Sequence, residues 1–194
     1  RPWRVLSLFA GIGGFDLACS WLGMEIAGQV EIDPFCQRVL AKHWPDALRA
    51  GDVREVRGDE FGPIDLVTAG FPCQPVSVAG QRRGAADDRW LWPEVARIVS
   101  VARPRWVLGE NVPGLVSLGL DGVLADLEGL GYACWAAIIP ACAVGAYHRR
   151  DRLWIVAHRN GDGPADEGNV RLLRAKGVAG DMTEEEATGM LGTS

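Results

Sequence analysis

Cys73 is the side chain whose setting in the sequence best suits covalent chemistry. It lies between Pro72 and Pro75, just after the apolar residues 64–69, which are typical of a buried strand. Because Pro72 fixes its own φ and restricts the preceding residue, the thiol would be held on a stiff turn. That turn would follow the carboxyl end of a strand, where ligands and chemistry gather in open α/β sheets. The pattern indicates a nucleophile, and the alternative is a small buried apolar residue, as most free cysteines are.

A second candidate site precedes Cys73, in a glycine turn near the start of the chain. Residues 4–9 are rich in β-formers, residues 10–14 read Ala-Gly-Ile-Gly-Gly, and residues 15–22 have helical spacing. A strand, a glycine turn and a helix form the first unit of a nucleotide-binding α/β fold, because glycines let a ligand approach backbone N–H groups. Glu31 follows the next predicted strand, where an acidic residue commonly accepts hydrogen bonds from ribose hydroxyls. Since the glycines do not match G-x-G-x-x-G, the pattern fits NAD, FAD or S-adenosylmethionine.

The elements that must position these residues alternate along the chain. Predicted strands cover a short run before Gly51 and residues 4–9, 25–30, 64–69, 105–109, 132–139 and 153–157. Predicted helices, the second of them capped by Asp33, cover residues 15–22, 34–43, 90–102 and 120–130. Seven strands with helices between most of them predict an α/β fold with a doubly wound, mainly parallel, Rossmann-like sheet. The last two strands have no clear helix between them, so we expect an antiparallel hairpin at one edge.

The net charge of -5 is unevenly distributed. Residues 161–194 hold seven acidic and three basic side chains, so four of the five net negative charges lie in this tail. The rest of the chain is nearly neutral and carries two local basic clusters, which are Arg82, Arg83 and Arg89, and His148, Arg149, Arg150 and Arg152. Because local patches set the field that a partner meets, the net charge does not exclude a nucleic acid.

The five cysteines show no C-x-x-C spacing, which argues against a disulfide framework and against a zinc site. We therefore expect no bound metal and a reducing, cytoplasmic location. Four of the cysteines lie in apolar patterns and are expected in the core, namely Cys19, Cys36, Cys134 and Cys142. No apolar run approaches the ~20 residues that a membrane-spanning helix needs, so we expect no membrane partner.

Taken in order, these segments resemble the DNA (cytosine-5)-methyltransferases, from about residue 5 to residue 156. Six ordered motifs carry the resemblance, and they lie at residues 9–14, 31–33, 51–53, 70–74, 110–112 and 150–152. Residues 70–74, Gly-Phe-Pro-Cys-Gln, form the most specific of them. The resemblance implies an S-adenosylmethionine-dependent enzyme that methylates C5 of cytosine in DNA.

The resemblance also assigns a cofactor site. Glu31 would hold the ribose of S-adenosylmethionine, Ile32 would pack on the adenine, and Asp52 would contact the adenine amino group. Val53 and Pro72 would line the same site. The residues of the first motif would cradle the methionine part, and they are Phe9, Gly11, Ile12, Gly13 and Gly14.

The nucleophile motif implies that Cys73 adds to C6 of the cytosine. Covalent addition makes C5 enamine-like and divides one difficult step into easier ones. Arg152 is the candidate positive charge that favours the thiolate, and Arg150 belongs to the same catalytic motif. Glu110, in its protonated form, would donate to cytosine N3 from an apolar or hydrogen-bonded setting. No residue claims the role of the base that removes the C5 proton, and water is one candidate.

The expected substrate is double-stranded DNA with its target base flipped out, because C5 and C6 are inaccessible within a stacked duplex. The polar segment that follows the nucleophile lacks a clear period, as functional loops often do. The resemblance assigns Ser77 and Arg89 to a loop that closes on the DNA. Arg82 and Arg83 suit phosphate contacts, and Gln74 adjoins the nucleophile. For each of these residues the alternative is a solvated surface position.

Residues 1–158 are predicted to form the catalytic domain, and residues 159–194 an acidic, Gly-rich tail that is flexible or begins a target-recognition region. Members of the family continue with such a region, so we expect a separate chain or domain to carry it. One hypothesis is a truncated or split methyltransferase of a prokaryotic or phage restriction–modification system. The alternatives are a cofactor-binding remnant without turnover, a tRNA cytosine methyltransferase, and a nicotinamide-dependent oxidoreductase. Cys73 together with Glu110 and Arg152 argues against the oxidoreductase.

Overall fold

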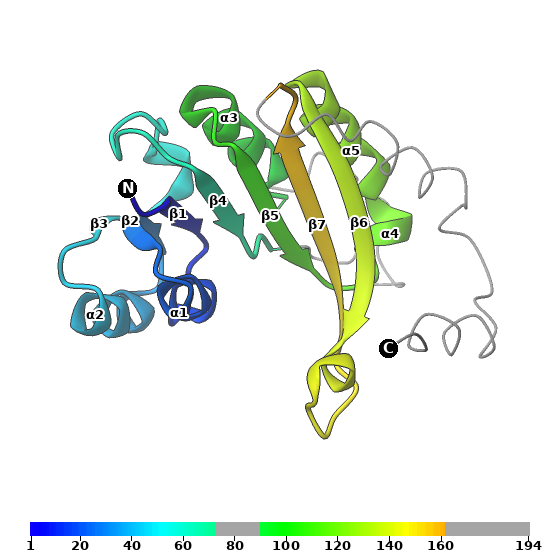
Figure 1. Cartoon of the computed structure of the whole chain (residues 1–194), viewed down its shortest axis with the longest axis horizontal. Coiled ribbons are helices and arrows are strands. Elements are labelled where there is room, and N and C mark those ends of the chain that lie inside the picture. The colour runs from blue at the N-terminus through cyan, green and yellow to red at the C-terminus, as the bar shows by residue number, and fades with distance from the viewer. Residues whose placement is uncertain (73–89, 162–194) are drawn as a thin grey trace. The chain divides into compact units, whose positions relative to one another are not determined.

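A seven-stranded sheet forms the centre of the part of the chain that the structure describes (Figure 1). In this computed structural model the described residues are 1–72 and 90–161. The strand order is β3-β2-β1-β4-β5-β7-β6. Five strands run parallel, namely β1 (Arg4–Leu8), β2 (Glu25–Val30), β3 (Leu48–Ala50), β4 (Leu66–Ala69) and β5 (Trp106–Asn111). At the far edge, β7 (Asp151–Arg159) lies antiparallel between β5 and β6 (Tyr132–Pro140), so the mainly parallel sheet with an edge hairpin is confirmed.

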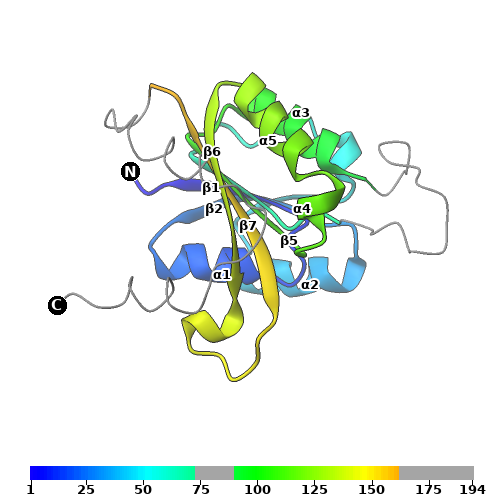
Figure 2. The same cartoon turned by 90° about the vertical axis from the view of Figure 1, so that its right-hand side faces the viewer.

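Helices cover both faces of the sheet, which confirms the doubly wound α/β fold (Figure 2). On one face lie α1 (Gly14–Trp21) and α2 (Pro34–His43). On the other lie α3 (Trp92–Ala102), the short α4 (Leu115–Leu118) and α5 (Leu120–Gly129). Asp33 begins α2 as predicted, because its Oδ1 accepts hydrogen bonds from two N–H groups of the first turn.

Two apolar cores hold these layers together. The larger core lies on the side of α3 and α5 and includes Leu6 and Ile98, both fully buried. The smaller core joins Val5 of β1 to Cys19 of α1. Because successive side chains of a strand point to opposite faces, Val5 and Leu6 enter different cores. A central strand buried on both faces reads as a continuous apolar run, which made β1 easy to predict.

The connection from β3 to β4 consists of the 3₁₀ turn η1 (Val53–Glu55) and a loop instead of an α-helix. It packs on the side of α3, because Val56 and Phe61 belong to the larger core. Phe61 fits there because β2 carries Gly28 opposite the ring. A Cβ on Gly28 would lie 2.2 Å from Cδ1 of Phe61. The strand glycine therefore makes room for the ring that anchors this connection.

Two strands extend beyond their predicted bounds. β5 was predicted over residues 105–109 and β7 over residues 153–157, and both are longer in the structure. The added residues include Glu110 and Arg152, whose charged side chains are more typical of loops than of strands. Both residues are nevertheless paired in the antiparallel ladders that β7 forms with β5 and β6. Glu110 and Arg152 therefore stand on strands, so the predicted end of β5 at residue 109 and the predicted start of β7 at residue 153 are wrong.

The prediction that Cys142 is a core residue is also wrong. The apolar sequence around it forms the 3₁₀ turn η3 (Ala141–Val144) at the end of the β6–β7 hairpin, where Cys142 is exposed. Cys19 is buried as predicted, whereas Cys36 and Cys134 are only partly buried. Within residues 1–72 and 90–161, no helix is long and apolar enough to cross a membrane.

Candidate functional site

The carboxyl ends of five parallel strands meet at one edge of the sheet and carry most of the predicted site residues. Because the strand order is β3-β2-β1-β4-β5, the direction of winding reverses between β1 and β4. Ligands of open α/β sheets bind in the crevice outside the strand ends at such a point. The residues at or just beyond these ends, in the order of the chain, are Phe9, Glu31, Asp52, Phe71, Pro72 and Glu110.

The glycine turn after β1 is a strained loop bonded to the end of β2. Phe9 has a φ of 54°, and Gly11 and Gly13 have φ values of 56° and 92°. This left-handed conformation suits glycine and costs energy at Phe9, and strained residues of this kind cluster at ligand sites. A Cβ added to Gly11 would meet no described atom within 4 Å. The backbone of the turn is thus open to a ligand on that side, with α1 beginning at Gly14 directly after it.

Glu31 links the glycine turn to the start of α2. Its Oε2 accepts a hydrogen bond of 2.7 Å from the Gly11 N–H, and its Oε1 accepts one of 2.8 Å from the Asp33 N–H. A carboxylate has about four lone-pair positions, so capacity for ligand hydroxyls is left over. Ile32 beside it is 66% exposed, which is unusual for an isoleucine and leaves its side chain open to a flat apolar group.

Asp52 stands as the cap of η1, which follows β3. Its Oδ1 accepts a hydrogen bond of 2.9 Å from the Arg54 N–H, and its Oδ2 forms an ion pair of 3.3 Å with the Arg54 guanidinium. Val53, the next residue, is buried in the larger core. The adenine-contacting residue implied by the third motif therefore lies on a short turn that is anchored by its apolar neighbour.

Glu110 and Arg152 meet as an ion pair across the β5–β7 ladder. Nε of Arg152 lies 2.7 Å from Oε1 of Glu110, and both side chains are about a quarter exposed. Gly70, which opens the nucleophile motif, lies beside them, because a Cβ there would be 3.7 Å from Oε2 of Glu110. Two of the predicted catalytic residues thus converge next to the segment that leads to Cys73.

The described residues form a pocket of about 530 Å³ between the start of α1 and the β6–β7 hairpin. Most of its wall is apolar, and its charged groups are Glu110, Arg150 and Arg152. The other lining residues are Gly14, Phe15, Ala18, Ile139, Pro140, Ala141, Val144 and Trp154. Phe15 and Trp154 touch edge to face with ring centroids 5.9 Å apart. The pocket therefore joins the glycine-turn half of the predicted site to its catalytic half.

Asn111 is a site residue that the motif match included but to which no role was assigned. Its Nδ2 donates a hydrogen bond of 3.0 Å to the Phe71 carbonyl, and its Oδ1 accepts one of 2.9 Å from the Val112 N–H. The Phe71 ring is buried against Trp90 and Trp92, at centroid distances of 6.0 and 5.2 Å. The two described ends that flank residues 73–89 are thereby packed together. The spacing of aromatics could not reveal this contact, because the partners are separated by that segment.

Several predicted residues lie outside the described ones, and these are Cys73, Gln74, Ser77, Arg82, Arg83 and Arg89. Within the described ranges, no cluster of His, Cys, Asp and Glu side chains could hold a metal ion.

Comparison with known proteins shows the family of the chain. The family model of the C-5 cytosine-specific DNA methylases matches residues 3–188. The chain belongs to the C-5 cytosine-specific DNA methylase family. It is 33% identical over 164 residues to the type II methyltransferase M.HgiCII of Herpetosiphon aurantiacus, covering 80% of this chain and 37% of that protein. It is also 33% identical over 162 residues to M.HhaI of Haemophilus parahaemolyticus, covering 81% of this chain and 49% of that protein.

The fold is similar to that of a solved structure. The structure of a Spodoptera frugiperda DNMT2 mutant superposes with a TM-score of 0.71 at 21% identity, over 85% of this chain and 52% of that one. At this identity the likeness concerns the fold alone. The chain spans between about a third and about half of the lengths of these relatives.

S-adenosylmethionine is the methyl donor of the C-5 cytosine-specific DNA methylases. The described residues fit this cofactor. Gly11 leaves the backbone open at the glycine turn, Glu31 retains acceptor capacity beside it, and Ile32 presents an exposed apolar surface. These three features follow β1 and β2 at the edge of the sheet where such ligands bind.

Proposed function

We propose that this chain is the cofactor-binding and catalytic part of an enzyme that transfers a methyl group from S-adenosylmethionine to C5 of cytosine in double-stranded DNA. The observation that carries the proposal is the pocket that joins the start of α1 to the Glu110–Arg152 pair, next to the segment leading to Cys73. Residues 1–158 would form the catalytic domain. Residues 159–194 would begin the part that chooses the target sequence.

Cys73 starts the reaction in this proposal. Its thiolate adds to C6, so that an S–C6 bond forms, the C5–C6 π electrons form a C4–C5 double bond, and the C4–N3 π electrons move to N3. Glu110 takes up a proton from solvent and donates it to N3 as this charge develops, and Arg152, 2.7 Å from Glu110, holds the carboxyl in place. S-adenosylmethionine, when bound, would supply an electrophilic methyl group on a positively charged sulfur, with the S–CH3 bond breaking as the C5–CH3 bond forms and the neutral thioether S-adenosylhomocysteine as the leaving group.

The second half of the reaction restores the ring. A base, which water can serve as, removes the C5 proton after methylation, and the released electrons re-form the C5–C6 double bond. The thiolate of Cys73 leaves at the same time, and the N3 proton returns to Glu110. Each bond made by Cys73 is thus broken again within one turnover.

The DNA would contact the polar segment after Cys73 and the residues at the start of β7. Ser77 and Arg89 would close on the duplex, and Gln74, which adjoins the nucleophile, would contact the DNA. Arg82 and Arg83 would contact phosphates. Arg150, which lines the pocket, would act beside Arg152.

A second candidate function is a cofactor-binding part that turns over only with a recognition part. The coverage of the relatives favours it, since the chain matches 37% of M.HgiCII and 49% of M.HhaI. The remaining length of such relatives is enough for a further domain. This candidate predicts S-adenosylmethionine binding by the chain alone and methylation only after a recognition part is supplied.

A covalent trap tests both candidates. A duplex containing 5-fluorocytosine, incubated with the chain and S-adenosylmethionine, should yield a covalent adduct, because fluorine at C5 blocks the elimination step. Cys73→Ser should form no adduct, whereas the matched control Cys142→Ser, at an exposed cysteine outside the pocket, should form it normally. An adduct that needs an added recognition domain supports the second candidate. No adduct on DNA under either condition would overturn the proposal, and an adduct on RNA alone would favour a tRNA cytosine methyltransferase.

A further inference from the structure

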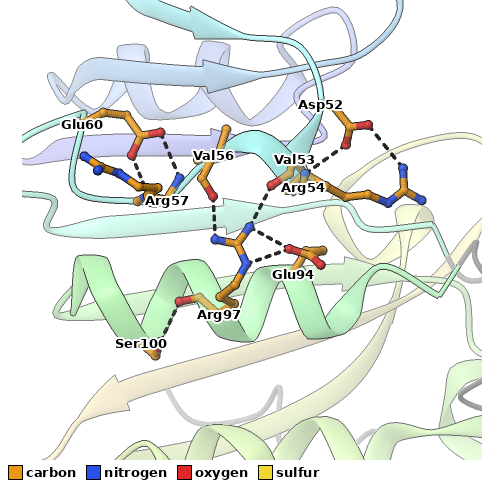
Figure 3. A network of polar contacts seen from close by, with 10 residues as sticks. Asp52, Val53, Arg54, Val56, Arg57, Glu60, Glu94, Arg97 and Ser100 are labelled. Carbon is orange, nitrogen blue, oxygen red and sulfur yellow. Dashed lines mark hydrogen bonds and ion pairs between the residues drawn. The ribbon is translucent and has the colours of Figure 1, made fainter.

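Arg97 of α3 holds the turn that carries Asp52 (Figure 3). Its Nη1 donates a hydrogen bond of 2.6 Å to the Val56 carbonyl, and its Nη2 donates one of 3.1 Å to the Val53 carbonyl. On the other side, Nε donates over 2.8 Å to the Glu94 carboxylate, one turn earlier on the same helix. One guanidinium thus bridges the helix and both ends of η1.

The contact matters because it anchors η1 to a helix outside the turn itself. The chain leaves the sheet at Ala50 and re-enters it at Leu66, and η1 with its loop makes up the connection. Val53 and Val56 are buried against the larger core, but apolar contacts do not set the orientation of a backbone turn. The guanidinium supplies that orientation, since its planar fork presents donors in fixed directions. The Val53 and Val56 carbonyls, at the two ends of η1, accept from it simultaneously.

Asp52 is fixed by the same arrangement. It is the residue that begins η1, and its carboxylate is bonded to the N–H and the guanidinium of Arg54 inside the turn. A rotation of η1 on the surface of α3 would therefore carry the Asp52 carboxylate with it. Arg97 itself is not among the residues that line the pocket.

We propose that Arg97 is a positioning residue for the adenine end of the cofactor, acting through η1 on Asp52. The inference rests on the proposed function, in which the Asp52 carboxylate accepts a hydrogen bond from the adenine amino group. It assigns Arg97 to recognition of the base of the cofactor, although the side chain does not contact that base.

The test uses two ligands that differ at the adenine amino group. S-adenosylhomocysteine carries the amino group, and S-inosylhomocysteine carries a carbonyl in its place. Isothermal titration should show that the full chain binds the adenosyl ligand at least about tenfold more tightly, because the carboxylate of Asp52 repels the carbonyl. Asp52→Ala should abolish this preference. Arg97→Ala should weaken the adenosyl ligand several-fold and leave the inosyl ligand unchanged.

Three further variants make the result decisive. Arg97→Lys should keep an intermediate preference, because one ammonium can serve only part of the fork. Asp52→Ala combined with Arg97→Ala should lose no more adenosyl affinity than Asp52→Ala alone. Arg57→Ala is the matched control, because this exposed arginine of the same connection pairs with Asp59 and should bind both ligands like the wild type.

The outcomes distinguish a failure of the proposed function from a failure of the inference about Arg97. If the wild type binds neither ligand, the proposed function is wrong. If it binds both without preference, the role of Asp52 is wrong and the inference for Arg97 falls with it. If the preference exists and Arg97→Ala and Arg97→Lys leave it unchanged, or weaken both ligands equally, Arg97 supports the fold and positions nothing in the site.

Discussion

Asp16 is the one buried carboxyl of the described residues whose pKa is raised by burial. It accepts hydrogen bonds of 3.0 Å from Ser7 Oγ and 2.8 Å from Gln29 Nε2, and Thr68 Oγ1 lies 3.2 Å from Ser7 Oγ. These partners stand on β1, β2 and β4, close to the strand ends that carry the candidate site. One polar layer therefore ties α1 to the three strands directly below the site.

The raised pKa of Asp16 predicts a pH dependence of stability. Between the ordinary value of 3.8 and the raised pKa, the folded chain binds more protons than the unfolded chain, so this residue makes stability fall as pH rises. Asp16→Asn should remove that slope. Urea unfolding from pH 4 to pH 8 measures it as the difference between wild type and variant. An identical slope in both proteins would show that Asp16 does not titrate in this range.

Asn111 is predicted to serve catalysis through the backbone of Phe71. Asn111→Ala leaves a buried carbonyl without its partner, which costs about 1–3 kcal/mol of stability. It should also slow adduct formation, since Phe71 lies two residues before Cys73, while S-adenosylmethionine affinity changes little. Adduct rates and isothermal titration give the two readouts. Ser117→Ala, an exposed control on α4, should change neither; equal losses of rate and affinity would contradict the prediction.

At the scale of elements, α2 shows what the sequence specifies on its own. The cap Asp33 and the following proline predict a start at Pro34, and the structure has it there. Glu110 and Arg152 show the opposite case. Their polar side chains look like loop residues, and only pairing between strands that are distant along the chain extends β5 and β7 to include them. The contacts of Arg97 could not be predicted for the same reason, because the carbonyls that accept its hydrogen bonds belong to a connection that meets α3 only after folding.

The cap of α2 offers a test at this scale. Asp33→Ala removes the acceptor of two N–H groups and should lower the unfolding midpoint by roughly 2–4 °C, whereas Asp33→Ser should keep most of it. The backbone hydrogen bonds lower the pKa of Asp33, so its contribution is present above the ordinary value of 3.8 and is lost as pH falls below it. Thermal unfolding at pH 7 and pH 3 should therefore separate the wild type from Asp33→Ala clearly at pH 7 and much less at pH 3.

For the whole molecule, the decisive property is selective stabilisation by the cofactor. A ligand present at 100 times its Kd stabilises the folded state by about 2.7 kcal/mol. S-adenosylmethionine should therefore raise the unfolding midpoint by roughly 5–10 °C, and NAD should not. Glu31→Gln should reduce the shift, because a neutral amide replaces the carboxylate that accepts hydrogen bonds from the glycine turn and from Asp33. A shift with NAD alone would instead favour an oxidoreductase.

The close packing of Phe61 against Gly28 has a consequence for the sequences of related proteins. A side chain at position 28 and a full ring at position 61 exclude each other, so position 28 can enlarge only if position 61 becomes smaller. Among relatives, the two positions should therefore covary, with a larger residue in β2 accompanied by a smaller one in the connection that carries Asp52. The absence of a side chain at Gly28 would then restrict, during evolution, which residues can occupy position 61, which lies 33 positions downstream.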